Sequence, residues 1–222
     1  MQIETIFFDL DATLYPVSNG LWPAIGVRID RYMREQMSIP ADETPQMRQR
    51  FYEQHGTTLR GLQIHYGIDA TEYLNYVHDL PLKEYLQPDP ELRKMLLSIP
   101  RRRWIFTNSD LAHAKRVMSR LGIDDCFEGV VDIFAMEPHC KPRREAYHRA
   151  LELADANDPQ SCALLDDSVK NLAPAHELGF FTVLVGGISD HPVVNRALPV
   201  IHDLRSIVPE FWENGSRGKH GG

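Results

Sequence analysis

Two carboxylates that could do chemistry, Asp9 and Asp11, stand two residues apart just after the apolar run at residues 3–8. That run is short and rich in β-branched and aromatic residues, which is typical of a buried strand. Strand alternation places residues 9 and 11 on one side of the chain, and ligands of open α/β sheets bind beyond the carboxyl ends of the strands. Two like charges so close call for a cation or a shared proton. One carboxylate can then act as nucleophile and the other as general acid or base, although a polar turn after a strand accounts for the same pair.

Polar residues also follow a later apolar run, at residues 104–106. Thr107, Asn108 and Ser109 come directly after it, and Asp110 begins a helical pattern. Hydroxyl, amide and free backbone N–H groups at the start of a helix suit a phosphate group. Capping of the helix by Ser109 or Asp110 is the plainer interpretation of these residues taken alone.

A second acidic pair, Asp166 and Asp167, follows the apolar run at residues 162–165. Carboxylates are hard oxygen ligands suited to Mg²⁺, whereas a helix cap and a solvated acid explain this pair equally well by itself. If Asp9 and Asp11 lie at the same edge of one sheet, the four carboxylates repel one another strongly unless a divalent ion lies among them. The combination therefore predicts a Mg²⁺ site.

Lys141 stands immediately before another helical pattern. A lysine is unfavourable near the positive end of a helix dipole, so its position there is consistent with a role in chemistry. The alternative is a solvated surface residue, as most lysines are.

From residue 103 onward, predicted strands alternate with predicted helices, and these elements must position the residues named above. Strands are predicted at residues 103–107, 130–134, 162–165 and 181–185, with a short edge strand at 199–201. Helices are predicted between and after them, at 111–121, 142–154, 169–178 and 204–208. Such alternation means right-handed βαβ units and a parallel, doubly wound sheet, so we expect an α/β fold with a Rossmann-like core.

Between the first strand and residue 88 the sequence contains only helical patterns, at residues 21–33, 47–55, 58–66 and 70–77. An all-helical block inserted after the first strand indicates a cap over the core. We therefore expect a catalytic core at residues 1–15 and 88–213 and a helical cap at 16–87. The polar, glycine-rich segment at 214–222 is predicted to be a flexible tail.

Composition narrows the class of partner. The 222 residues carry a net charge of −7, which argues against a nucleic-acid polymer as partner. No apolar run is long enough to span a bilayer, and the N-terminus has no basic region typical of a signal peptide. The three cysteines, Cys126, Cys140 and Cys162, lack metal-ligand spacing, which favours a reduced, cytoplasmic setting. We expect a monomer or a homodimer.

Taken in order, Asp9-Leu10-Asp11, Thr107-Asn108, Lys141 and Asp166-Asp167 resemble the four motifs of the haloacid dehalogenase superfamily, and the helical insert resembles the C1-type cap of that superfamily. The resemblance implies that Asp9 attacks phosphorus and carries an aspartyl-phosphate, while Asp11 protonates the leaving alcohol and then activates water. It implies that Thr107 and Asn108 bind the phosphoryl group and that Lys141 neutralises charge between Asp9 and the phosphate.

The resemblance also implies a ligand set for Mg²⁺. The set comprises Asp9, the backbone carbonyl of Asp11, and Asp166, with Asp167 either a further ligand or a partner of the ligands. The dehalogenases that give the superfamily its name lack an acid at the position of Asp11, so its presence favours phosphate esters over haloacids. Ala12 departs from the Gly or Asn that many relatives carry there.

Three shorter segments, at residues 11–16, 56–62 and 76–79, resemble the pyrimidine 5′-nucleotidase branch. The expected substrate is therefore UMP or CMP, with Arg60 reaching the nucleobase or sugar and His78 or Asp79 hydrogen-bonding it. A surface charge at Arg60 and an ordinary helix residue at His78 are the alternatives. Competing functions are a phosphatase of small sugar phosphates, a phosphoglucomutase-like transferase and, more distantly, a phospho-aspartyl switch or binding module.

Overall fold

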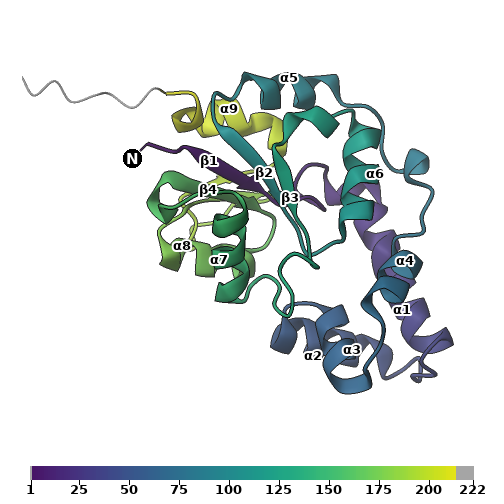
Figure 1. The fold of residues 1–222 in the computed structure, drawn as a ribbon. Helices are drawn as coiled ribbons and strands as arrows, with labels where there is room; N and C mark the ends of the chain where they lie inside the picture. The colour runs from purple at the N-terminus through teal and green to yellow at the C-terminus, as the bar shows by residue number, and fades with distance from the viewer. Residues whose placement is uncertain (1, 214–222) are drawn as a thin grey trace, which may run out of the picture.

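The computed structural model describes residues 2–213, so the predicted flexible tail lies outside the described residues. Within them, six parallel strands form one sheet in the order β3-β2-β1-β4-β5-β6 (Figure 1). The bounds of the strands are β1 Thr5–Phe8, β2 Arg102–Phe106, β3 Gly129–Val131, β4 Cys162–Asp166, β5 Phe181–Val185 and β6 Arg196–Leu198. The α/β class and the parallel Rossmann-like sheet are confirmed.

Strand β1 lies in the middle of the sheet because its side chains are apolar on both faces. It pairs with β2 and β4, with Phe8 beside Ile105 on one strand and Leu165 on the other. Ile6 and Phe8 belong to the hydrophobic cluster on one face, and Phe7 belongs to the cluster on the other. A strand buried on both faces is typical of parallel sheets covered by helices on both sides.

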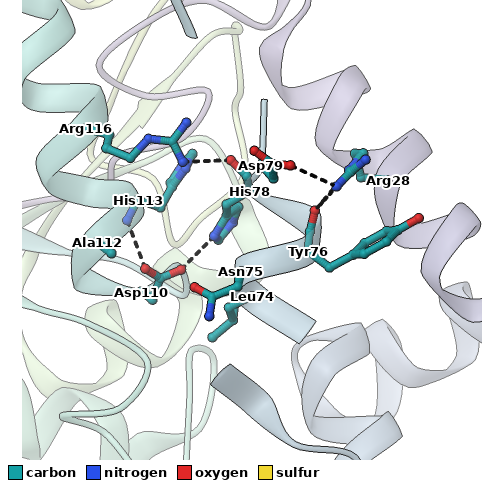
Figure 2. Close-up of a pocket in the computed structure, with 10 residues that line it drawn as sticks. All are labelled: Arg28, Leu74, Asn75, Tyr76, His78, Asp79, Asp110, Ala112, His113 and Arg116. Atoms are coloured by element: carbon teal, nitrogen blue, oxygen red, sulfur yellow. Dashed lines mark hydrogen bonds and ion pairs between the residues drawn. The ribbon is translucent and has the colours of Figure 1, made fainter. Parts of the chain in front are cut away.

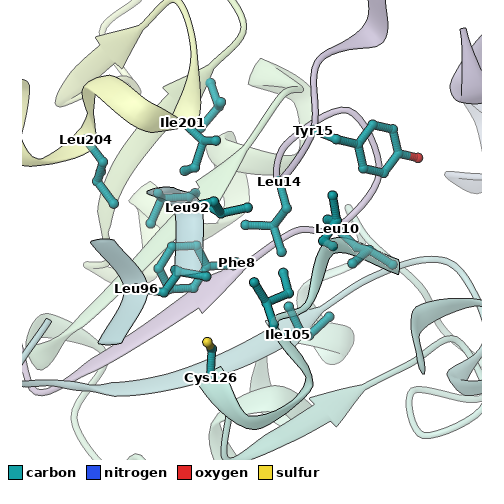
Figure 3. Packing of buried hydrophobic residues seen from close by; sticks show 14 of the residues in the cluster. Phe8, Leu10, Leu14, Tyr15, Leu92, Leu96, Ile105, Cys126, Ile201 and Leu204 are labelled. Atoms are coloured by element: carbon teal, nitrogen blue, oxygen red, sulfur yellow. The ribbon is translucent and has the colours of Figure 1, made fainter. Parts of the chain in front are cut away.

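Helices cover the two faces as separate layers. The first face packs against α5 (Pro90–Ser98), α6 (Leu111–Leu121) and α9 (Leu204–Ile207), and Figure 3 shows Leu92, Leu96 and Leu204 around Phe8. The second face packs against α7 (Arg144–Leu153) and α8 (Val169–Leu178). This three-layer arrangement brings the carboxyl ends of β1, β2 and β4 together at one edge.

Four helices are inserted between β1 and α5: α1 Leu21–Glu35, α2 Thr44–His55, α3 Thr58–Tyr66 and α4 Ala70–Val77. They gather beyond the carboxyl ends of the strands (Figure 1). Side chains of Asp69 and Asp89 accept backbone N–H bonds at the starts of α4 and α5, as expected of N-cap residues. The helical insert is thus present, while the boundaries drawn at residues 15, 87 and 213 stay a prediction.

Some element boundaries were wrong. Strand β3 ends at Val131 because the chain turns at Asp132, whose carboxylate accepts the N–H groups of Leu111 and Ala135. The edge strand lies at Arg196–Leu198 and not at 199–201, since Pro199 has no N–H with which to continue the ladder. Helix α7 begins at Arg144 and not at residue 142. Among residues 2–213, no helix is both long and apolar enough to cross a membrane.

Candidate active site

Asp9 directly continues the central strand. Its backbone N–H donates to the Leu165 carbonyl at 2.8 Å, as the next rung of the β1–β4 ladder, and the residue is buried. Thr13 Oγ1 lies 3.3 Å from Asp9 Oδ2. The next turn contains Ala12 in the left-handed region, at φ 63°. This conformation gives a physical reason for Gly or Asn at the position in relatives, because both adopt it at little cost.

Lys141 is a buried cation between two carboxylates. Its Nζ lies 2.8 Å from Asp9 Oδ1 and 2.6 Å from Asp166 Oδ2, and the residue is 0% exposed. Burial by itself would lower the pKa of Lys141, but the charges of Asp166 and Asp9 raise that pKa above its ordinary value. The ammonium therefore stays charged, and the surface-lysine alternative is wrong.

Asn108 holds the backbone of Lys141 by a reciprocal pair of hydrogen bonds. Asn108 Nδ2 donates to the Lys141 carbonyl at 3.0 Å, and the Lys141 N–H donates to Asn108 Oδ1 at 2.9 Å. The cap loop packs on the same carbonyl at Gly56, where φ is +88° and a Cβ would lie 2.5 Å from the Lys141 oxygen. A glycine is required there, and Asn108 acts on the site through Lys141.

Three of the four residues predicted to hold Mg²⁺ converge through their carboxylates. Carboxylate oxygens of Asp9, Asp166 and Asp167 lie within 4.8 Å of one another. Asp166 is fixed by the Ser168 N–H at 2.9 Å and by Asn171 Nδ2 at 2.9 and 3.2 Å. These three hard oxygen donors, clustered at one point, match the ligand preference of Mg²⁺.

The electrostatics of this acidic cluster also fit a divalent ion. Burial raises the pKa of Asp9 well above its ordinary value; Lys141 opposes this shift, and Asp166 and Asp167 add to it. The side chain of Asp167 is still exposed to solvent, but partial desolvation by the surrounding protein and the charge of Asp166 raise its pKa to about 7. One ammonium is thus too little positive charge for these carboxylates, and a divalent ion would supply the rest.

Asp11 is held by three hydrogen-bond donors. Tyr15 Oη lies 2.5 Å and His113 Nε2 lies 2.8 Å from Asp11 Oδ1, and Ser109 Oγ lies 2.6 Å from Oδ2. Burial alone would raise the pKa of Asp11, but His113, through its charge and hydrogen bond, and the hydrogen bonds from Ser109 and Tyr15 bring that pKa well below its ordinary value. The carboxylate is therefore ionised and fixed in direction.

The two candidate helix caps, Ser109 and Asp110, prove to have different hydrogen-bond partners. Asp110 caps α6, accepting the His113 N–H at 2.9 Å. Ser109, the other candidate cap, instead bonds Asp11, while Thr107 Oγ1 accepts the Ser109 N–H at 3.0 Å. None of the three partners of Asp11 (Tyr15, Ser109 and His113) was predicted from the sequence.

A cleft of about 470 Å³ joins these groups to the cap. On the core side it is lined by Asp9, Asp11, Thr107, Asn108, Lys141 and Asp167. On the cap side, apolar and aromatic residues alternate with polar ones, among them Arg48, which bonds Asp30 at 3.0 Å, and His78, which was expected to contact the substrate. Cap and core therefore share one concave site, with the reactive groups on the core side.

Comparison with known proteins now decides the family. Residues 3–179 match the haloacid dehalogenase-like hydrolases. This chain belongs to that family. Phosphate metabolism protein 8 of Saccharomyces cerevisiae is 27% identical over 195 residues, which cover 82% of this chain and 61% of the yeast protein. The chain thus spans less than two thirds of the length of that relative.

Solved structures share the fold of this chain. The HAD-hydrolase YfnB from Bacillus subtilis bound to magnesium has a TM-score of 0.61 at 16% identity, with 93% of this chain and 98% of that chain covered. CbbY from Rhodobacter sphaeroides in complex with phosphate has a TM-score of 0.65 at 17% identity, with 91% and 96% covered. At such identities the likeness concerns the fold alone, and the pyrimidine nucleotidase branch stays a prediction.

Two residues expected to contact substrate in this haloacid dehalogenase-like hydrolase do not line the cleft. Arg60 is buried, and its guanidinium donates to Glu137 Oε1 and to the carbonyls of Ile133 and His139 at 3.0–3.1 Å. It clamps the cap to the loop before Lys141, so the expectation that it reaches a nucleobase or sugar is corrected. Asp79 is exposed beside Arg28 at 3.8 Å, outside the cleft lining.

Proposed function

We propose that the chain is a Mg²⁺-dependent phosphomonoester hydrolase that works through an aspartyl-phosphate on Asp9. The observation that carries this proposal is the buried ammonium of Lys141 between Asp9 and Asp166, at one end of a cleft that also contains the fixed carboxylate of Asp11. Phosphoryl transfer needs alignment and positive charge on the equatorial oxygens more than it needs covalent chemistry.

The proposed steps use these side chains as follows. Asp9 attacks phosphorus, the ester oxygen leaves with a proton from Asp11, and water activated by Asp11 then hydrolyses the aspartyl-phosphate. The pKa of Asp11 is low in the free protein. The negative charge of a bound phosphate raises that pKa, so Asp11 can carry the proton that the first step requires. The free carboxylate is suited to the second step, in which it acts as a base.

Thr107 and Asn108 line the cleft beside Asp9, and we propose that the Thr107 hydroxyl and the backbone N–H of Asn108 bind the phosphoryl oxygens. Lys141 offers the cation closest to Asp9. Asp9, Asp166 and Asp167, with the backbone carbonyl of Asp11, would hold Mg²⁺. The metal would add the second positive charge that phosphoryl transfer requires.

For the substrate we propose a pyrimidine nucleoside 5′-monophosphate, UMP or CMP. The resemblance of three segments to pyrimidine 5′-nucleotidases supports this choice, as does a cap lining in which Trp22, Tyr52 and Tyr73 offer apolar surface for a flat base beside Arg48. The name of the yeast relative, which places it in phosphate metabolism, is compatible with such an enzyme. We also propose a cytoplasmic setting, since all three cysteines are free thiols.

Two assays test the proposal. With p-nitrophenyl phosphate and Mg²⁺, the wild-type chain should turn over, whereas Asp9→Asn and wild type in EDTA should not. Substantial activity in either would refute the mechanism. A panel of UMP, CMP, glucose 1-phosphate and glucose 6-phosphate tests the substrate: no preference for the nucleotides would remove the nucleotidase assignment and leave the phosphatase one.

A further inference from the structure

A stacked pair of buried histidines connects the cap to Asp11. The rings of His78 and His113 lie 3.9 Å apart, centroid to centroid, at 20° between their planes. His78 is the C-cap residue that directly follows α4 in the cap, and His113 lies in the first turn of α6 in the core. The pair also borders a second cavity, of about 370 Å³, at this junction of cap and core (Figure 2).

His113 differs from the other donors to Asp11 in what holds it. Its Nε2 donates to the carboxylate, because an ionised carboxylate only accepts. A histidine used in this way normally has its other ring nitrogen fixed by a hydrogen bond. Within the described part of the chain, however, Nδ1 of His113 is buried and has no hydrogen-bond partner. Since no bond to Nδ1 fixes the ring, its stacking on His78 helps to hold its plane.

His78 is itself fixed to α6 at two further points. Its Nδ1 lies 2.7 Å from Asp110 Oδ2, and its carbonyl accepts Arg116 Nη1 at 2.9 Å (Figure 2). Burial and the neighbouring His113 lower the pKa of His78, so its ring is neutral and can stack on His113 without charge repulsion. The C-cap residue of α4 is therefore bound to the N-terminal half of α6, which supplies His113.

We propose that His113 is a positioning residue that aims the Asp11 carboxylate, and that the cap residue His78 keeps His113 in place, so that docking of α4 on α6 completes the general acid. The inference rests on the proposed function, because it assigns a means of orientation to Asp11 in that reaction. It makes the first step, protonation of the leaving oxygen, depend on a contact between cap and core.

A series of aryl phosphates tests the inference without knowledge of the physiological substrate. p-Nitrophenolate leaves without a proton, whereas the leaving group of phenyl phosphate needs one. For His113→Leu we expect kcat/KM for phenyl phosphate to fall by about 10²-fold or more, the size of a general-acid contribution. Because p-nitrophenolate needs no proton to leave, kcat/KM for p-nitrophenyl phosphate should fall by less than about tenfold. KM should be nearly unchanged for both esters.

Two further variants separate aiming from folding. His113→Gln places an amide nitrogen at the same number of bonds from Cβ as Nε2, so it should restore most of the phenyl phosphate activity. His78→Ala removes the stacking ring and should lower the ratio of kcat/KM for phenyl phosphate to kcat/KM for p-nitrophenyl phosphate, as His113→Leu does. His78→Phe should lower this ratio less. As a matched control, His202→Leu breaks a similar histidine–aspartate pair, to Asp89 at 2.9 Å, away from the cleft and should leave the ratio unchanged.

The outcomes are distinct. Equal losses for both esters in His113→Leu, or no loss, would overturn the positioning role. Failure of His113→Gln to recover activity, with an unchanged melting temperature, would also overturn it. If the wild-type chain hydrolyses no member of the series in the presence of Mg²⁺, the proposed function itself fails.

Discussion

Replacing the buried cation offers the sharpest test of the electrostatics of the site. Lys141→Met keeps the unbranched chain up to the position of Cε but leaves Asp9 and Asp166 without the ammonium that lies 2.8 and 2.6 Å from their oxygens. The burial of all three groups prevents water from replacing the lost charge. We therefore expect the variant to be destabilised in the absence of metal as well as inactive.

The magnitude follows from the distances. At an effective dielectric constant of 20, each of the two contacts contributes about 6 kcal/mol of attraction, and the cost of removing the ammonium from water, several kcal/mol, offsets part of it. Breaking a buried ion pair by deleting one partner costs about 3–5 kcal/mol. For a chain of this size that corresponds to a fall in melting temperature of about 6–20 °C.

Calorimetry in EDTA and in Mg²⁺ measures the effect. Lys94→Met, which removes an exposed lysine from α5, is the matched control and should melt like wild type. The double variant Lys141→Met/Asp166→Asn should recover part of the loss because it removes one of the unpaired charges, and Mg²⁺ should raise the melting temperature of Lys141→Met more than that of wild type. A melting temperature in EDTA within about 2 °C of wild type, roughly 1 kcal/mol or less, would refute this reasoning.

Three other predictions concern the same cluster. Asp9→Asn should lose turnover without loss of melting temperature in EDTA: the folded protein raises the pKa of Asp9, so the ionised carboxylate costs stability above pH 4 and the neutral amide removes that cost. Titration calorimetry should show Mg²⁺ affinity falling as pH drops through about 7, since Asp167 must release a proton to bind it; a flat profile between pH 8 and 6 contradicts this. Asn108→Ala should lower stability by about 1–3 kcal/mol, because it leaves the N–H and carbonyl of Lys141 unpaired, and unchanged unfolding in urea would contradict it.

The residues at the strand ends were predictable because topology alone brings them together. Once β1, β2 and β4 are neighbours in a parallel sheet, Asp9, Thr107 and Asp166 must meet at one edge, wherever their side chains point. Lys141 was harder, since most lysines are exposed and its segment contains no strand or helix; its burial depends on Asn108, which lies 33 positions earlier in the chain.

The partners of Asp11 and the role of Arg60 depend on contacts that no local pattern contains. His113 did leave a signal: it lies on the apolar face of α6 with Val117 and Leu121, where a titratable residue is unusual. Arg60 gave no such signal in the sequence, because its position depends on hydrogen bonds to carbonyls of a loop more than 70 positions away. Sequence patterns predict on which face of a helix or at which edge of a sheet a residue lies. Which hydrogen-bond partner it takes there depends on tertiary packing.

The most direct test of the central claim is to find the phosphoryl group on Asp9. Asp11→Asn lacks the base for the second step, so mixing it with p-nitrophenyl phosphate and Mg²⁺, quenching in acid and digesting should yield a phosphorylated peptide. Borohydride reduction should then convert Asp9 alone to homoserine, as read by mass spectrometry. The account predicts one phosphoryl group per chain, at Asp9. Turnover by this variant with no phosphorylated intermediate, or a phosphoryl group on any other side chain, would contradict it.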